Sequence, residues 1–207
     1  MHRIESVDQL MDDYRVDIRP YYVLISAMVG EPLPALSNEL RAICEHLRRC
    51  SDPSSSQDYR KRELEKASDH LVRFKLDVLK AILLLCEKRY EKLQESYRGV
   101  PVQNIDNKRF FSKIIPPFVE SQKLCIQAKL DEPDNKAEAI KSYKASVDKL
   151  LKIDQYLDIV TCRMRRLKVE FYAKMIISFV LSVGLTITSC VIDVYVDWFI
   201  EIFCSIK

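Results

Sequence analysis

The sequence predicts an all-α protein, in which a cytoplasmic helical bundle leads through long helices into a carboxy-terminal membrane segment. Three observations support this class. The 207 residues include only three glycines and eight prolines, too few for the tight turns that β-hairpins need. Apolar residues recur every three or four positions along most of the chain, which is the spacing of one helix face. Residues 58–97 contain neither glycine nor proline, enough for about 60 Å of unbroken helix.

The first half of the chain divides into three predicted helices. Ser6 caps an amphipathic helix that continues to about Ile18, where Pro20 ends or kinks it. A second helix carries an apolar stripe from Leu36 to Leu47 and stops near Cys50, and the polar residues 51–57 form a surface loop. The long third helix ends at Gly99 and Pro101.

The second half begins with a helix predicted from Asp106 to Leu130, broken or bent at Pro116-Pro117 and followed by a turn at residues 131–135. A coiled-coil-like seam comes next, and it suits either an intramolecular bundle or a neighbouring subunit. Its members step by three and four residues: Ile140, Tyr143, Val147, Leu150, Leu157, Val160, Met164, Leu167 and Phe171. We therefore divide the chain into a bundle at 1–135, a long connecting helix at 136–174 and a membrane segment with an acidic amphipathic end at 175–207.

The overall charge and the cysteines restrict the chemistry of the chain. The net charge of +3 provides no basic excess for binding a polyanion. The seven cysteines form no Cys-x-x-Cys pair and have no histidine at zinc spacing, so we interpret them as reduced thiols of a cytosolic chain rather than as metal ligands or disulfides. We expect no metal and no cofactor.

The strongest signal is an apolar segment of eighteen uncharged residues between Lys174 and Asp193. As a helix it is about 27 Å long, just enough for the hydrocarbon core of a bilayer. Basic residues precede it and acidic residues follow it, so the positive-inside rule keeps residues 1–174 in the cytoplasm. Trp198, Phe199 and Phe203 suit the far interface. The alternative is a buried core helix of a soluble protein.

Polar residues follow one another along this segment at steps of three and four, which places them on one helix face. They are Ser178, Ser182, Thr186, Ser189, Asp193, Asp197 and Glu201. Small hydroxyl residues commonly allow close helix packing in membranes. Alternatively, the face lines a pore whose acidic end favours cations. Because each chain has a single span, a water-filled lumen requires several chains in a ring.

A second motif lies in the first quarter of the chain, where Arg41 and His46 stand five residues apart in the sequence RAICEH. An arginine and a histidine at this spacing on a helix resemble the motif of the HEPN superfamily. The resemblance implies a composite site between paired protomers, where the imidazole moves protons and the guanidinium stabilises a developing phosphorane during metal-independent RNA cleavage. Arg41 pairing with Glu39 or Glu45, and His46 contacting a neighbour, would instead give both residues a structural or assembly role.

The motif and the membrane segment together resemble the small, divergent HEPN-like membrane accessory proteins of type VI-B CRISPR systems. This resemblance implies a homo-oligomeric ring in the bacterial inner membrane that permeabilises the bilayer and enhances antiphage defence by an RNA-guided CRISPR effector. Two other functions stay open. One is a membrane-anchored HEPN ribonuclease with Arg41 and His46 as catalytic residues, and the other is a passive tail-anchored scaffold.

Overall fold

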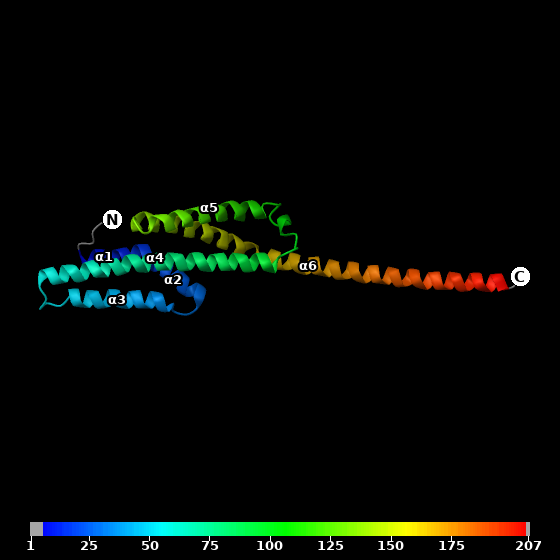
Figure 1. Cartoon of the computed structure of the whole chain (residues 1–207), viewed down its shortest axis with the longest axis horizontal. Coiled ribbons are helices and arrows are strands. Elements are labelled where there is room, and N and C mark those ends of the chain that lie inside the picture. Colours follow the sequence, from blue (N-terminus) through cyan, green and yellow to red (C-terminus); the bar gives the residue numbers. More distant parts are fainter. Residues whose placement is uncertain (1–5, 206–207) are drawn as a thin grey trace. The chain divides into compact units, whose positions relative to one another are not determined.

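The computed structural model describes the backbone of residues 6–205 and the side chains of residues 6–192 and 195. This part of the chain is all-α and contains no strand (Figure 1). The elements in chain order are α1 (Val7–Asp13), the π-helical turn η1 (Tyr14–Ile18), α2 (Arg19–Val29), α3 (Pro34–Cys50), α4 (Gln57–Ser96), the 3₁₀ turn η2 (Val102–Asn104), α5 (Phe110–Asp131) and α6 (Lys136–Ser205).

Pro20 changes the hydrogen bonding of the first helical segment without ending it. Ser6 caps α1, as predicted, and its hydroxyl accepts a hydrogen bond from the Gln9 amide at 3.1 Å. Proline has no amide proton for the carbonyl four residues earlier. The chain widens into the η1 turn just before it, with the Arg19 amide bonded to the Tyr14 carbonyl, and Pro20 then occupies the first turn of α2. The helical path therefore continues to Val29, where Gly30 at φ 78° caps it.

The helix expected from Asp106 begins four residues later, at Phe110. Asp106, Asn107 and Lys108 have φ angles of 55°, 55° and 69°, which lie outside the right-handed helical region. Of the predicted break or bend at Pro116-Pro117, the break is wrong, because both prolines lie inside the continuous α5. Their fixed φ is compatible with a helix, but each removes an amide donor and its ring crowds the carbonyl four residues earlier, so α5 contains them at a cost in stability. The helix from 36 to 50 and the turn after Asp131 are confirmed.

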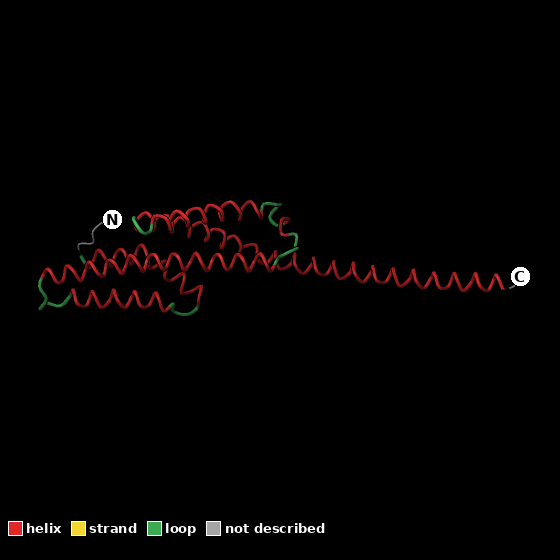
Figure 2. The backbone as a smooth tube through the Cα atoms, in the orientation of Figure 1, coloured by secondary structure: helices red, strands yellow, loops and turns green. Residues whose placement is uncertain are grey.

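Contacts divide the chain into two compact units. The first contains residues 1–96 and 111–158. In it α3 and α4 lie side by side and run in opposite directions (Figure 2), as do α5 and the start of α6. Serines join the second pair, because the Ser121 and Ser146 hydroxyls are buried and 2.8 Å apart. The small side chains let the two backbones approach closely.

The second unit contains residues 97–110 and 159–207. Val100, Val102 and Ile105 are buried, as are Val160 and Met164 of α6. The Lys168 ammonium lies 5.3 Å from the centre of the Tyr97 ring, a cation–π contact between the loop and the helix. The irregular segment after α4 thus packs against one part of α6.

The predicted seam of α6 is buried over most of its length. Tyr143, Val147, Leu150, Leu157, Val160 and Met164 are all buried, and Ile153 joins them. Ile140, Leu167 and Phe171 at the two ends are partly exposed. Asp154 lies beside the seam and bonds to Arg89 of α4, 2.7 Å away. A seam within the chain therefore accounts for this pattern.

We predict that Phe74→Ala lowers the free energy of unfolding by about 3–5 kcal/mol. Phe74 is fully buried on α4 and its ring contacts Tyr14 and Tyr22, with centroids 6.4 and 5.4 Å apart. Val23→Ala, at an exposed position beside Tyr22, is the control and should change stability by about 0.5 kcal/mol or less. Urea unfolding of the full chain in detergent, followed by circular dichroism, measures both. Equal losses would contradict the described core.

Candidate functional site: an exposed apolar segment and a histidine–glutamate cluster

The apolar segment at residues 175–192 is exposed along its whole length. It forms part of α6, which contains a stretch long and apolar enough to cross a membrane. Ile176, Leu181 and Leu185 are 60%, 61% and 72% exposed, whereas the seam earlier in the same helix is buried. Within one chain, the segment is therefore not the buried core helix of the alternative prediction.

The hydroxyl residues of the segment differ in how they are satisfied. Thr186 donates its hydroxyl proton to the Ser182 carbonyl at 2.9 Å, and Thr188 donates to the Gly184 carbonyl at 2.8 Å. Such bonds within one helix satisfy a threonine in an apolar environment. Ser178 and Ser189 make no hydrogen bond through their hydroxyls with any described group. The acidic continuation of the face, at Asp193, Asp197 and Glu201, lies outside the described side chains, as do Trp198, Phe199 and Phe203.

His46 is held by a buried carboxylate that the sequence analysis did not identify. Its Nδ1 atom lies 2.8 Å from Oε2 of Glu63 on α4. Glu63 is 1% exposed and also accepts a hydrogen bond from the Lys66 ammonium at 2.7 Å. Arg49 of α3 lies 3.9 Å from the same carboxylate. The contact expected between His46 and a neighbour is therefore present, and it joins α3 to α4.

A second histidine repeats this arrangement in the opposite direction. His70 of α4 lies with Nδ1 2.8 Å from Oε2 of Glu39 on α3. The rings of His46 and His70 are stacked, with centroids 5.2 Å apart and an angle of 24° between the planes. Each imidazole thus has one ring nitrogen directed at a carboxylate of the facing helix. We call these four residues, Glu39, His46, Glu63 and His70, the histidine–glutamate cluster.

Arg41 is separate from this cluster. Its side chain is exposed, and it has no hydrogen bond or ion pair with another described side chain. The expected pairing of Arg41 with Glu39 or Glu45 is wrong, because Glu39 bonds to His70 and Glu45 bonds to Arg48 and Arg49. Within one chain, Arg41 and His46 therefore do not form a common site.

The charges around Glu63 favour its ionised form. Hydrogen bonds from Lys66 and His46 hold the pKa of Glu63 below its ordinary value, although burial opposes this effect. A buried carboxylate with fewer donors would be destabilised, so these contacts also stabilise the packing of α3 on α4. A carboxylate that bonds to Nδ1 fixes the orientation of an imidazole and leaves Nε2 for other contacts. No three His, Cys, Asp or Glu side chains gather as a metal site among the described residues.

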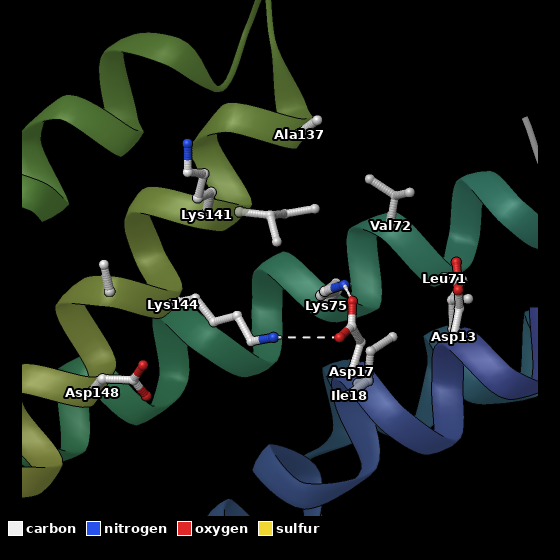
Figure 3. Close-up of a pocket in the computed structure, with 12 residues that line it drawn as sticks. Asp13, Asp17, Ile18, Leu71, Val72, Lys75, Ala137, Lys141, Lys144 and Asp148 are labelled. Carbon is white, nitrogen blue, oxygen red and sulfur yellow. Dashed lines mark hydrogen bonds and ion pairs between the residues drawn. The ribbon is translucent and has the colours of Figure 1, made fainter. Parts of the chain in front are cut away.

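One cavity of about 620 Å³ lies beside η1, α4 and the first turns of α6 (Figure 3). The carboxylate of Asp17 lies between two lysines at its wall, 2.5 Å from Lys75 and 3.3 Å from Lys144. The hydrogen bond from Lys75 is the main reason that the pKa of Asp17 is lowered. Three aspartates and three lysines line this cavity, so it has no excess of either charge with which to attract an ion.

The sequence contained a partial signal for the cluster. Glu63, Lys66 and His70 follow at steps of three and four on α4, next to the apolar face that packs on α3. Their spacing indicates a shared helix face, but which residues of α3 lie opposite depends on the interhelical register.

Comparisons with protein families, with curated proteins and with solved structures found no match to this chain. The HEPN resemblance therefore stays a prediction based on Arg41 and His46.

The two residues of the motif should differ in their effect on stability. We expect His46→Ala to lower the free energy of unfolding by about 1–3 kcal/mol, because it removes a hydrogen bond from a buried charge. Arg41→Ala should change it by about 0.5 kcal/mol or less, since its side chain is exposed. Urea unfolding of the full chain in detergent provides the comparison. A stability unchanged by His46→Ala would refute the structural role of the imidazole.

Glu63 should also make stability depend on pH. The pKa of Glu63 is lower in the folded chain than its ordinary value of 4.5, so the unfolded chain binds this proton more tightly. Its stabilising contribution is complete above that ordinary value and is lost as the pH falls through the lower, folded pKa. Glu63→Gln should therefore make the acid loss of stability shallower. Unfolding temperatures below pH 5 measure it, and Glu138→Gln, at a solvated pair with Lys141, should retain the wild-type slope.

Proposed function

We propose that the chain is the subunit of an oligomeric membrane pore. The observation that carries the proposal is the exposed apolar segment at residues 175–192, with hydroxyl residues along one of its faces. A segment with this exposure requires lipid or other helices around it. The bilayer supplies the first, and further copies of the chain supply the second.

Energetics favour assembly over a solitary span. Ten residues of the segment are Ile, Leu, Val or Phe. At about −0.3 to −0.6 kcal/mol each, they contribute roughly −3 to −6 kcal/mol to the free energy of insertion. The hydroxyl residues and the glycine make that free energy less favourable. A single segment is thus only marginally inserted. Several copies that turn their polar faces inward would remove Ser178 and Ser182 from contact with lipid.

The acidic residues after the segment give the pore its proposed selectivity. Asp193, Asp197 and Glu201 continue the hydroxyl face in sequence, and a ring multiplies each carboxylate by the number of subunits. Rings of carboxylates concentrate cations and exclude anions. Helix packing without a lumen is the competing use of the same face, and ion flux distinguishes the two.

The cellular role follows from the resemblance and from the flanking charges. Exposed basic residues before the segment, including Arg163, Arg165 and Lys174, favour a cytoplasmic body by the positive-inside rule. A cytoplasmic body on an inner-membrane pore suits an accessory factor that permeabilises the membrane when an RNA-guided CRISPR effector detects a phage. The bond of His46 to buried Glu63 within the chain supports a structural role for this residue of the HEPN-like motif over ribonuclease activity.

Reversing the acidic charges should change ion selectivity. We expect Asp193→Lys with Asp197→Lys to reduce or invert cation preference in liposome flux assays, because a ring of lysines repels cations. The control is Glu138→Lys, at an exposed position near the start of α6, which should retain the wild-type preference. Unchanged selectivity in oligomers of normal size would remove the acidic residues from the lumen.

Two further measurements separate the competing functions. Ser182→Leu should close the flux path while the protein stays in the membrane fraction; loss of the oligomer instead would favour packing without a lumen.

RNA incubated with the wild-type protein in EDTA should stay intact. Cleavage that both Arg41→Ala and His46→Ala abolish would overturn the assembly role and favour the ribonuclease.

A further inference from the structure

Helix α5 buries large apolar side chains only near its beginning, where Phe110 and Ile114 are 3% and 1% exposed, and its buried residues further along are small. Ser121 and Ala128 are buried against the rest of the first unit, 2% and 0% exposed. Five other large apolar residues of the helix are exposed. They are Phe111, Ile115, Val119, Ile126 and Leu130, which we call the α5 stripe, and they are 42–68% exposed.

These five positions form one continuous surface. At 100° per residue, they fall within about 100° of the helix circumference and extend along about 28 Å of its length. Single exposed apolar residues are ordinary on a protein surface, but an aligned set is typical of an interaction site. The α5 stripe lies outside the apolar segment of α6, so insertion of that segment into a bilayer does not by itself cover it.

The steps between successive positions of the α5 stripe are the same when they are read from either end of the helix. With the exposed Gln122 included, the steps from Phe111 to Leu130 are four, four, three, four and four residues. Two copies of α5 lying antiparallel would therefore place Phe111 opposite Leu130, and Ile115 opposite Ile126, of the partner copy. Such self-complementarity is what a two-fold contact requires.

The charges at the ends of α5 favour the same antiparallel arrangement. Lys113 lies in its first turn, and Lys108 and Arg109 precede it in sequence. Asp131 ends the helix and Asp134 follows it, with Lys129 as one positive charge in the last turn. Glu132 adds a further carboxylate, which already bonds to Lys80 of α4. Antiparallel copies bring the basic end of each helix to the acidic end of the other, whereas parallel copies align like charges. The helix dipoles add to the preference, because each positive end then meets a negative one.

We propose that the α5 stripe binds the α5 stripe of a second copy of this chain in an antiparallel, two-fold contact. The contact uses a surface other than the membrane segment and does not depend on the pore. It differs from the head-to-tail contact that repeats around a ring.

Cysteine cross-linking tests the register directly. The variant Phe111→Cys with Leu130→Cys places two thiols about 28 Å apart on one helix, too far for a disulfide within a chain. The full chain is purified in detergent, oxidised with copper phenanthroline and digested with trypsin. We expect a disulfide between the peptides of residues 110–113 and 130–136 in most of the protein. Neither peptide contains a native cysteine, so its identification is unambiguous.

Two comparisons make the test specific. Adding Ile126→Glu should reduce the cross-link at least tenfold, whereas Gln127→Glu, one residue away and off the stripe, should retain it. The pair Ile115→Cys with Ile126→Cys repeats the test at the second facing position, in case replacement of Phe111 disturbs folding. Links joining 111 to 111 or 130 to 130 would overturn the antiparallel register. Absence of both expected links in protein with wild-type circular dichroism would overturn the contact itself.

Discussion

The buried seam of α6 is the constraint on which the rest of the described structure depends. Between Tyr143 and Leu157 one face of this helix meets the first unit, and Val160 and Met164 continue it in the second. The packing with α5 relies on the paired serines at 121 and 146, and the contact with α4 relies on Arg89 and Asp154. After Phe171 the same helix buries no described side chain. One continuous helix thus changes from a packing element into a segment whose surroundings lie outside its own chain.

Polar contacts give the bundle its register, because apolar faces alone permit neighbouring helices to slide by one turn. Glu63 reaches across to His46 while Glu39 reaches back to His70, and both contacts fail together if α3 shifts along α4. Asp17 acts similarly, since it bonds to Lys75 and Lys144 on two different helices. A buried charge costs desolvation free energy, so its benefit is in selecting one arrangement more than in overall stability.

The helices themselves could be predicted from periodicity and punctuation. Gly99 and the polar loop after Cys50 mark ends that the structure confirms. Errors arose where backbone conformation overrode composition: three residues with positive φ delayed α5, and Pro116 and Pro117 were accommodated inside it. The partners of His46 could not be predicted, because they depend on which turn of α4 faces α3. The direction of the α5 stripe was missed for a related reason. An amphipathic pattern indicates two faces, but burial of Ser121 and Ala128 rather than Ile126 depends on how closely α6 approaches.

The α5 contact and the proposed pore impose different symmetries on the same chain. A two-fold contact is closed, because each stripe is fully used by one partner. A ring of more than two copies instead repeats one head-to-tail contact. Neighbours in such a ring turn their polar faces towards a common axis, and a two-fold contact through α5 does not supply the repeated contact that the ring needs. The proposed ring therefore requires a second, head-to-tail contact in addition to the α5 contact.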